Sequence, residues 1–208
     1  MTIFIDPKLK DNAYYDTSGK IVIAEVLAGD PDVVLREYTH HILQDARPKG
    51  ELSPFTAIQS GLADYLPCSF NNSPLFAVAS APVFNQIYHQ QLFPNGYLRN
   101  MVNQVRLDTP ASTVSQQAIG EGWGGAFWEL RELIGVNPTD SLVFEAWTTA
   151  KTIADSSPAS LAFARGILAL VTARHPKASQ RAQAIFERRG LSVGAGKARV
   201  AQRRRAAS

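Results

Sequence analysis

The sequence predicts an α+β fold in which a small, strand-rich N-terminal lobe precedes a mostly helical C-terminal lobe. Short runs of β-branched and apolar residues are confined to the first 30 residues, which are expected to be strand-rich. Beyond residue 30, polar residues that favour helix N-caps stand directly before prolines, and each pair is followed by a stretch of helix length. We expect one domain over residues 1–190 and a disordered basic tail over residues 191–208.

The extended segments come first in the chain. Two segments are rich in β-branched residues and either alternate between polar and apolar residues or are continuously apolar. This pattern predicts strands over Thr2–Ile5 and Lys20–Val26. Thr17-Ser-Gly19 between them has the composition of a turn. Two strands with a turn before the second therefore form the expected start of the fold.

Five polar–proline pairs predict where the helices begin. Proline is tolerated at the first helical position because the N–H that it lacks would be unpaired there. The pairs are Asp30-Pro31, Ser53-Pro54, Thr109-Pro110, Asn137-Pro138 and Ser157-Pro158. The helices expected behind them span residues 31–46, 54–66, 110–135 (with a break near Gly120 left open), 138–154 and 158–174. Further helices are expected over 81–93 and from Pro176 to Arg189, the latter ended by Gly190.

Composition excludes a disulfide framework and a membrane span. Hydrophobic residues make up 45% of the chain and charged residues 19%, the balance of a globular domain with its own core. The single cysteine, Cys68, has no partner for a disulfide within the chain, and no apolar run is long enough to cross a bilayer. The N-terminus has neither the basic start nor the long apolar stretch of a secretory signal, and the sequence assigns no compartment.

The net charge of +3 comes from the end of the chain. Residues 197–208 contain five basic and no acidic residues, so the rest of the chain has a net charge of about −2. Because no aromatic residues lie between these charges, we expect a solvated terminus, and nucleic acid is not the expected partner. Binding of nucleic acid or another anionic surface through this tail is kept as an alternative. The basic residues are Lys197, Arg199, Arg203, Arg204 and Arg205.

One predicted helix contains most of a metal-binding pattern. The helix that begins at Pro31 includes Arg36-Glu37-Tyr38-Thr39-His40. Positions 36, 37 and 40 lie on neighbouring parts of one helical face, because residues four apart stack one turn apart. With histidine at position 36 this would be His-Glu-x-x-His, the zinc-binding helix of metallopeptidases. Ser60-Gly-Leu-Ala-Asp64 follows on the next predicted helix, twenty residues after His40.

These two helices resemble those of the thermolysin and fungalysin type of zinc metallopeptidase, the gluzincins. In that family the second helix supplies a glutamate as the third zinc ligand, followed four residues later by an aspartate. The resemblance places Ser60 at the glutamate position and Asp64 at the aspartate position, and it implies a zincin-like fold with a substrate cleft between two lobes.

Two further segments extend the resemblance over roughly residues 12 to 190. The run Asn12-Ala-Tyr-Tyr-Asp16, followed by Gly19–Ile23, resembles the edge strand that lines the family's substrate cleft. The resemblance therefore implies peptide-binding roles for Asn12 and Ala13. Residues 117–131 resemble the segment that follows a catalytic histidine, and that histidine, which stabilises the oxyanion, falls on Gln117.

The residues that would hold the zinc are replaced in this chain. Arg36 cannot ligate a metal because a guanidinium stays protonated and has no lone pair to donate. Ser60 is a short neutral hydroxyl in place of a charged carboxylate, so only His40 survives from the three ligands, and we expect no zinc or other cofactor. Without metal-bound water, Glu37, the former general base, has nothing to activate. Gln117 can donate a hydrogen bond to an oxyanion, but it carries no positive charge.

Arg36 is predicted to have a structural role. In the family the aspartate at the position of Asp64 orients the first histidine ligand. We therefore expect an Arg36–Asp64 ion pair, shared with Glu37, to link the two helices where the metal would lie. His40 is expected to be a core histidine. A metal site made of His40, Asp64 and Cys68 is an alternative. Two observations argue against it: Pro67 is expected to disturb that helix, and most buried cysteines are inert.

The expected function is that of a pseudopeptidase, a peptidase-like domain that acts by binding or scaffolding. An extended peptide or a protein partner could still add to an unpaired strand edge that lines a cleft. An active hydrolase or metallopeptidase with an atypical metal site is an alternative, although no Gly-x-Ser-x-Gly elbow or Cys/His pattern supports hydrolysis without a metal. Members of the resembled family are generally secreted with a propeptide, and neither feature is visible in this chain.

Overall fold

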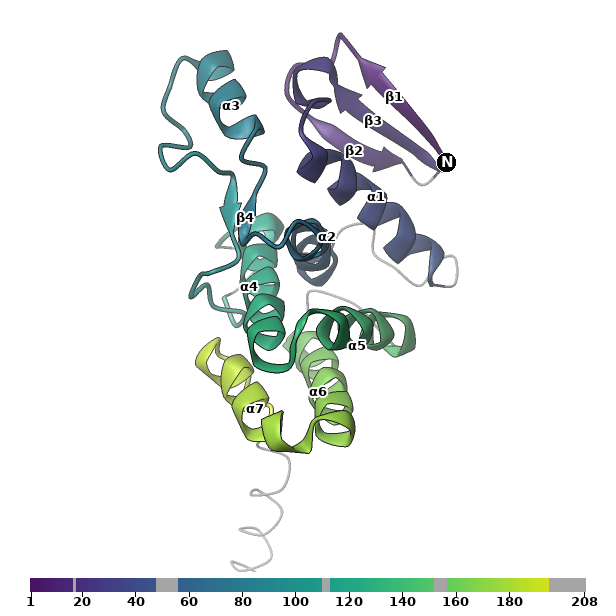
Figure 1. The fold of residues 1–208 in the computed structure, drawn as a ribbon, viewed down its shortest axis with the longest axis vertical. Helices are drawn as coiled ribbons and strands as arrows, with labels where there is room; N and C mark the ends of the chain where they lie inside the picture. Colours follow the sequence, from purple (N-terminus) through teal and green to yellow (C-terminus); the bar gives the residue numbers. More distant parts are fainter. Residues whose placement is uncertain (17, 48–55, 110–112, 152–156, 195–208) are drawn as a thin grey trace, which may run out of the picture.

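The computed structural model describes residues 1–16, 18–47, 56–109, 113–151 and 157–194. These residues form a mixed α+β fold with a strand-bearing N-terminal part and a helical remainder, as the sequence predicts (Figure 1). The elements in chain order are β1 (Thr2–Asp6), β2 (Ala13–Asp16), β3 (Lys20–Ala24), the 3-10 helix η1 (Glu25–Leu27), α1 (Pro31–Asp45), α2 (Ala57–Phe70), β4 (Leu75–Phe76), α3 (Ser80–Tyr88), β5 (Arg99–Asn100), α4 (Gln116–Ile134), α5 (Val136–Thr149), α6 (Ser157–Arg174), the 3-10 helix η2 (Pro176–Ala178) and α7 (Ser179–Arg188).

The N-terminal strands form one three-stranded sheet in the order β1-β3-β2. β3 runs parallel to β1 and antiparallel to β2, so β2 is an edge strand. Tyr15, Ile21 and Ile23 of this sheet are buried, and α1 packs against β2 and β3 (Figure 1). The β2 strand thus lies beside the helix that contains Arg36.

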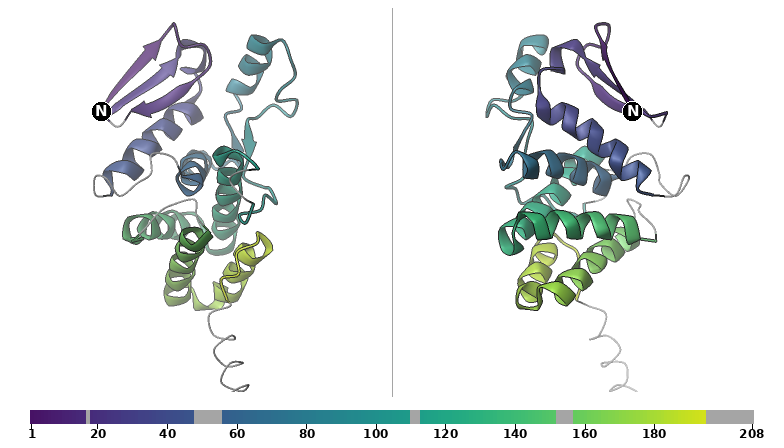
Figure 2. Two further views of the ribbon diagram at one scale, coloured as in Figure 1. Left: turned by 180° about the vertical axis from the view of Figure 1, so that it is seen from behind. Right: turned by 45° about the vertical axis from the view of Figure 1, so that its right-hand side comes forward.

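Helix α2 lies at the centre of the molecule, where it packs against α1 on one side and crosses α4 on the other (Figure 2). The crossing is close because glycines meet there: a Cβ added to Gly61 would lie 2.5 Å from the Cβ of Trp123 and 2.7 Å from the carbonyl oxygen of Gly120. Trp123, Phe127 and Trp128 of α4 are buried in the core. Helices α5, α6 and α7 complete the end of the molecule opposite the sheet.

Two aspartates at the start of α1 connect this helix to the segment that leads into β4 and α3. Asp30 caps α1 by accepting the Asp32 N–H, and its other oxygen accepts both the N–H and the hydroxyl of Ser80. Asp32 accepts the Ala77 N–H at 2.8 Å and the side-chain amide of Asn71. These bonds fix the position of α1 relative to the chain that continues into β5.

Several helix boundaries differ from those predicted. The Asp30-Pro31 start is confirmed, but the Asn137-Pro138 start is wrong, because α5 begins at Val136 after Gly135, whose φ is +96°. Helix α2 begins behind Thr56, whose side chain accepts the Gln59 N–H, and it continues through Pro67 instead of ending before it. Ser53-Pro54 and Pro110 lie outside the described residues. The predicted start at residue 110 is wrong all the same, because α4 begins at Gln116 behind Ser115, whose side chain accepts the Ala118 N–H, and it continues through Gly120 without a break.

The packed part of the chain extends beyond residue 190, the predicted end of the domain. Gly190 has φ +94° and follows the end of α7, as expected, but Leu191 and Val193 are buried in the core. The core therefore includes residues as far as Val193, and residues 195–208 of the predicted tail lie outside the described residues. In the described part of the chain, no helix has the length and apolarity to span a membrane.

Candidate functional site: a buried arginine–carboxylate cluster

Arg36 of α1 forms the predicted ion pair with Asp64 of α2. The Arg36 Nε donates to Asp64 Oδ1 at 2.8 Å, and the Asp64 side chain is fully buried. The Arg36 side chain is 17% exposed, so the pair lies just below the surface and not in solvent. A planar guanidinium bound to a buried carboxylate therefore connects the two helices, which confirms the predicted contact.

Glu37 belongs to the same cluster, and it also contacts the edge strand. Arg36 Nη1 donates to Glu37 Oε1 at 2.6 Å, and the backbone N–H of Tyr15 donates to the Glu37 carboxylate. Burial raises the pKa of Glu37 above its ordinary value, although the charge of Arg36 and these hydrogen bonds oppose the shift. The Glu37 carboxylate is thus held between a cation and a backbone donor.

The register of β2 explains why the Tyr15 N–H is available to Glu37. The Ala24 N–H donates to the Asn12 carbonyl at 2.9 Å, which makes residues 12 and 24 a hydrogen-bonded pair. Because hydrogen-bonded and non-bonded pairs alternate along an antiparallel ladder, the backbone groups of Ala13 and Tyr15 point away from β3, to the outer edge. Asn12 is exposed and Ala13 is half-buried at this edge.

Arg99 is a member of the cluster that sequence reasoning missed. It lies on the two-residue strand β5, and its Nη1 donates to Asp64 Oδ1 at 3.1 Å. The Arg99 guanidinium also lies 5.4 Å from the centre of the Phe76 ring. Asp64 Oδ1 is therefore shared by two arginines, and the two cations balance the charges of Asp64 and Glu37. No pattern in the sequence connects Arg99 to the metal-site motifs, since it stands 35 residues after Asp64.

His40 is buried close to these cations. It is 2% exposed, as expected of a core histidine. Burial, together with the charges of Arg36 and Arg99, holds the pKa of His40 well below its ordinary value of 6.5, so the imidazole is neutral. The neutral His40 imidazole lies near the two positive guanidiniums of Arg36 and Arg99. A zinc ion that approached this imidazole would be repelled by both charges.

Ser60 and Gln117, the other two residues predicted from the resemblance, form no hydrogen bond with the cluster among the contacts of the described residues. Ser60 is buried, and it faces α4: a Cβ added to Gly120 would lie 2.7 Å from the Ser60 Cβ. Gln117 is exposed on the first turn of α4, three residues before Gly120. The small side chain of Ser60 therefore fits the close packing of α2 on α4.

The alternative metal site at Cys68 does not assemble. In the described ranges, no three His, Cys, Asp or Glu side chains are grouped so that they could hold a metal ion. Cys68 is buried, and burial raises the pKa of its thiol, with the nearby charges of Asp32 and Asp64 adding to the shift. A thiol in this environment stays protonated and packs as a small apolar side chain.

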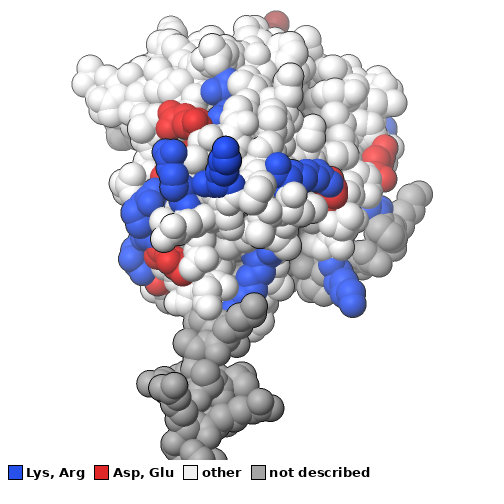
Figure 3. All heavy atoms as spheres, turned by 60° about the horizontal axis from the view of Figure 1, so that its bottom comes forward, with Lys and Arg blue, Asp and Glu red and all other residues white. Residues whose placement is uncertain are grey.

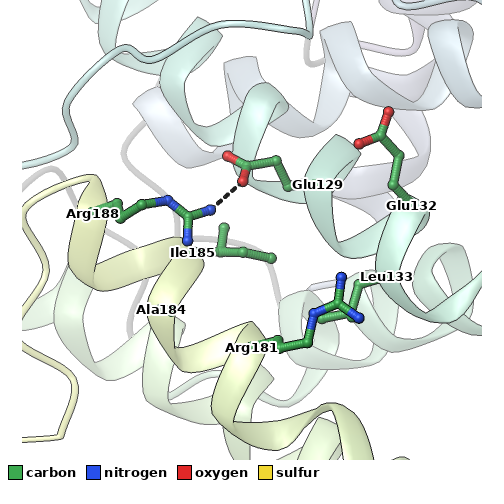
Figure 4. Close-up of a pocket in the computed structure, with 7 residues that line it drawn as sticks. All are labelled: Glu129, Glu132, Leu133, Arg181, Ala184, Ile185 and Arg188. Carbon is green, nitrogen blue, oxygen red and sulfur yellow. Dashed lines mark hydrogen bonds and ion pairs between the residues drawn. The ribbon is translucent and has the colours of Figure 1, made fainter.

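A pocket of about 250 Å³ lies away from this cluster, between α4 and α7 (Figure 4). Its walls carry two acidic and two basic side chains over an apolar floor. Glu129 on α4 is already paired with Arg188 at 2.5 Å and with the buried Arg189 at 2.8 Å. The lining residues are Glu129, Glu132, Leu133, Arg181, Ala184, Ile185 and Arg188.

Comparison of the chain with family models, with curated proteins and with solved structures found no match.

Proposed function

We propose that this chain is a zincin-like, degenerate gluzincin domain that binds extended peptides and does not hydrolyse them. The observation that carries the proposal is the Arg36–Asp64 contact. Arg36 occupies the first ligand position of the His-Glu-x-x-His pattern, and Asp64 occupies the position that orients that ligand in the resembled family. The two positions touch, as the resemblance requires, but through a guanidinium that cannot ligate zinc.

The same cluster removes the remaining parts of the peptidase mechanism. Hydrolysis of this type needs a metal that lowers the pKa of a bound water and polarises the carbonyl. It also needs a carboxylate that is free to accept the proton of that water. Glu37 instead accepts hydrogen bonds from Arg36 and from the Tyr15 N–H, and Gln117 offers no positive charge to an oxyanion. Loss of the metal position and occupation of the base support an inactive site.

The free edge of β2 supports peptide binding. Among the strands of the described ranges, β2 pairs only with β3, and the backbone groups of Ala13 point to its outer edge. An extended peptide can add to such an edge through main-chain hydrogen bonds. Since Glu37 takes the Tyr15 N–H, Ala13 is the residue through which we expect a peptide to bind.

Peptide binding is tested by titration calorimetry with a library of unstructured peptides, comparing the wild type with Ala13→Pro. The proline removes the outward N–H but no bond to β3, so the sheet is expected to stay intact while binding is lost. Circular dichroism verifies that the variant is folded. Absence of binding by the wild type at millimolar peptide concentration contradicts the binding proposal.

Loss of catalysis is tested by reversion. The triple variant Arg36→His, Ser60→Glu and Gln117→His restores the three substituted reaction positions, with Arg36→His alone as the control. We expect the wild type and the single variant to leave casein uncleaved, and zinc-dependent cleavage by the triple variant would support the resemblance. Cleavage by the wild type that a chelator abolishes would overturn the proposal.

A further inference from the structure

The charges of the chain are divided between its two ends. Residues 157–208 contain eleven of the 21 basic residues but only one of the 18 acidic residues, a net charge of +10. The first 156 residues contain ten basic and 17 acidic residues, a net charge of −7. A division of this size within one chain is typical of proteins whose basic end binds a polyanion.

The basic end includes folded surface and not the tail alone. Helices α6 and α7, with η2 between them, form the end of the molecule opposite the sheet (Figure 1). Lys and Arg side chains gather over the face that this end presents (Figure 3). Between residues 157 and 194, six residues are basic and Glu187 is the single acid. The six are Arg165, Arg174, Lys177, Arg181, Arg188 and Arg189.

Internal pairing separates these six cations into two groups. Arg174 binds Glu145 at 2.7 Å, and Arg188 and Arg189 bind Glu129, so their charges are compensated. Lys177 and Arg181 are exposed, and neither has a carboxylate partner in the part of the chain that the structure describes. Arg165 is also exposed, and its Nε donates to the backbone carbonyl of Val193. The cations that remain for an external anion therefore lie on consecutive elements, from α6 through η2 to α7.

The partner that fits this surface is a nucleic-acid backbone. No large hydrophobic side chain is exposed among the described residues 158–194, so the surface offers no apolar group for insertion into a bilayer. The backbone of nucleic acid presents phosphates at regular spacing, and several neighbouring cations can bind them at once. Lysine and arginine make such phosphate contacts without contacting the bases. We propose that the α6–η2–α7 surface binds the phosphate backbone of nucleic acid through Lys177 and Arg181. This proposal does not depend on the function of the Arg36 cluster.

The test measures binding of the full-length chain to a fluorescent DNA duplex of about 20 base pairs by anisotropy, at several salt concentrations. Lys177→Glu/Arg181→Glu is compared with Lys8→Glu/Lys20→Glu. This control makes the same change of charge at two exposed lysines of the three-stranded sheet and its connecting loop. We expect the first pair to weaken binding about tenfold or more and to lower the salt slope by about 2, while the second changes affinity by less than about twofold.

Three results would overturn the proposal. If the two double variants lost DNA affinity equally, binding would depend on net charge and not on a defined surface. If Lys177→Glu/Arg181→Glu bound DNA as tightly as the wild type, these two residues would not contribute, and the tail would account for the binding. Tighter binding to vesicles of phosphatidylserine and phosphatidylcholine than to DNA would assign the surface to a membrane.

Discussion

Arg36 and Asp64 join two helices through one buried ion pair. The carboxylate of Asp64 is fully buried and is shared by Arg36 and Arg99. A buried carboxylate without its cations is costly, because burial removes hydration that only opposite charge and hydrogen bonds can replace. At the scale of the residue, the cluster therefore contributes mainly to stability.

Removal of the Arg36 guanidinium tests this contribution. Arg36→Ala leaves Asp64 with Arg99 alone and Glu37 without its ion pair, so we expect the free energy of unfolding to fall by about 2–3 kcal/mol, below the loss typical of a fully buried pair. Urea denaturation measures this loss. Arg174→Ala, which removes the exposed pair with Glu145, is the control and should cost much less. Equal losses of unfolding free energy in the two variants would contradict a structural role of the cluster.

The depressed pKa of His40 gives stability a defined dependence on pH. The unfolded chain protonates this imidazole near its ordinary pKa of 6.5, whereas the folded chain does so only at much lower pH. Below pH 6.5 the unfolded state therefore binds more protons, and the free energy of unfolding falls as the pH falls. The raised pKa of Glu37 acts in the opposite direction, so a variant is needed to isolate the effect of His40.

Replacing His40 by glutamine, which is uncharged at every pH, removes this component. We expect the free energy of unfolding of His40→Gln to fall less steeply than that of the wild type between pH 6.5 and about pH 5. The slopes should differ by at most about 1.4 kcal/mol per pH unit. Urea titrations of both proteins across this range measure the slopes, and parallel curves would contradict a neutral, buried His40.

At the scale of the element, the crossing of α2 on α4 determines where the cluster lies. Gly61 and Gly120 let the helix backbones approach, and Ser60 fills the space beside them. Asp64 follows one helical turn after Ser60, and its carboxylate accepts hydrogen bonds from Arg36 of α1 and Arg99 of β5. The start of α1 could be predicted from Asp30 and Pro31. The crossing of α2 on α4 could not, because glycines identify close approach only once the partner helix is known.

Substitution of Gly61 tests this crossing. The new methyl group of Gly61→Ala would lie 2.5 Å from the Trp123 Cβ, so we expect a loss of about 1–3 kcal/mol from overpacking. Gly166 on α6 is the matched control, since a Cβ there meets nothing within 4 Å. Gly166→Ala should stabilise the protein by about 0.5–1 kcal/mol through helix propensity. Thermal unfolding of both variants measures the difference, and a neutral Gly61→Ala would contradict the close crossing.

Other features of the elements were not predictable from local sequence. The start of α5 was misplaced because Asn137-Pro138 has the pattern of a cap, whereas Gly135, with its positive φ, ends α4 and begins α5 directly. Arg99 was missed because it lies on a strand of two residues whose position beside Asp64 depends on the bonds that Asp30 and Asp32 make to the preceding segment.

At the scale of the whole molecule, two separate surfaces emerge from one chain. The sheet edge and the arginine–carboxylate cluster lie at the acidic end, and the α6–η2–α7 surface lies at the basic end. The tail charge was visible in the sequence, but its continuation onto folded helices depended on which arginines are paired internally. The account of the acidic end rests on the absence of a ligand set for zinc at positions 36 and 60.

Metal content measures that claim most directly. The chain is purified without chelator, exchanged into buffer with zinc at the level of the protein, freed of unbound metal and analysed by elemental mass spectrometry. The account predicts no zinc above the buffer blank, both in the wild type and in His40→Gln. One zinc per chain in the wild type, lost in His40→Gln, would contradict it.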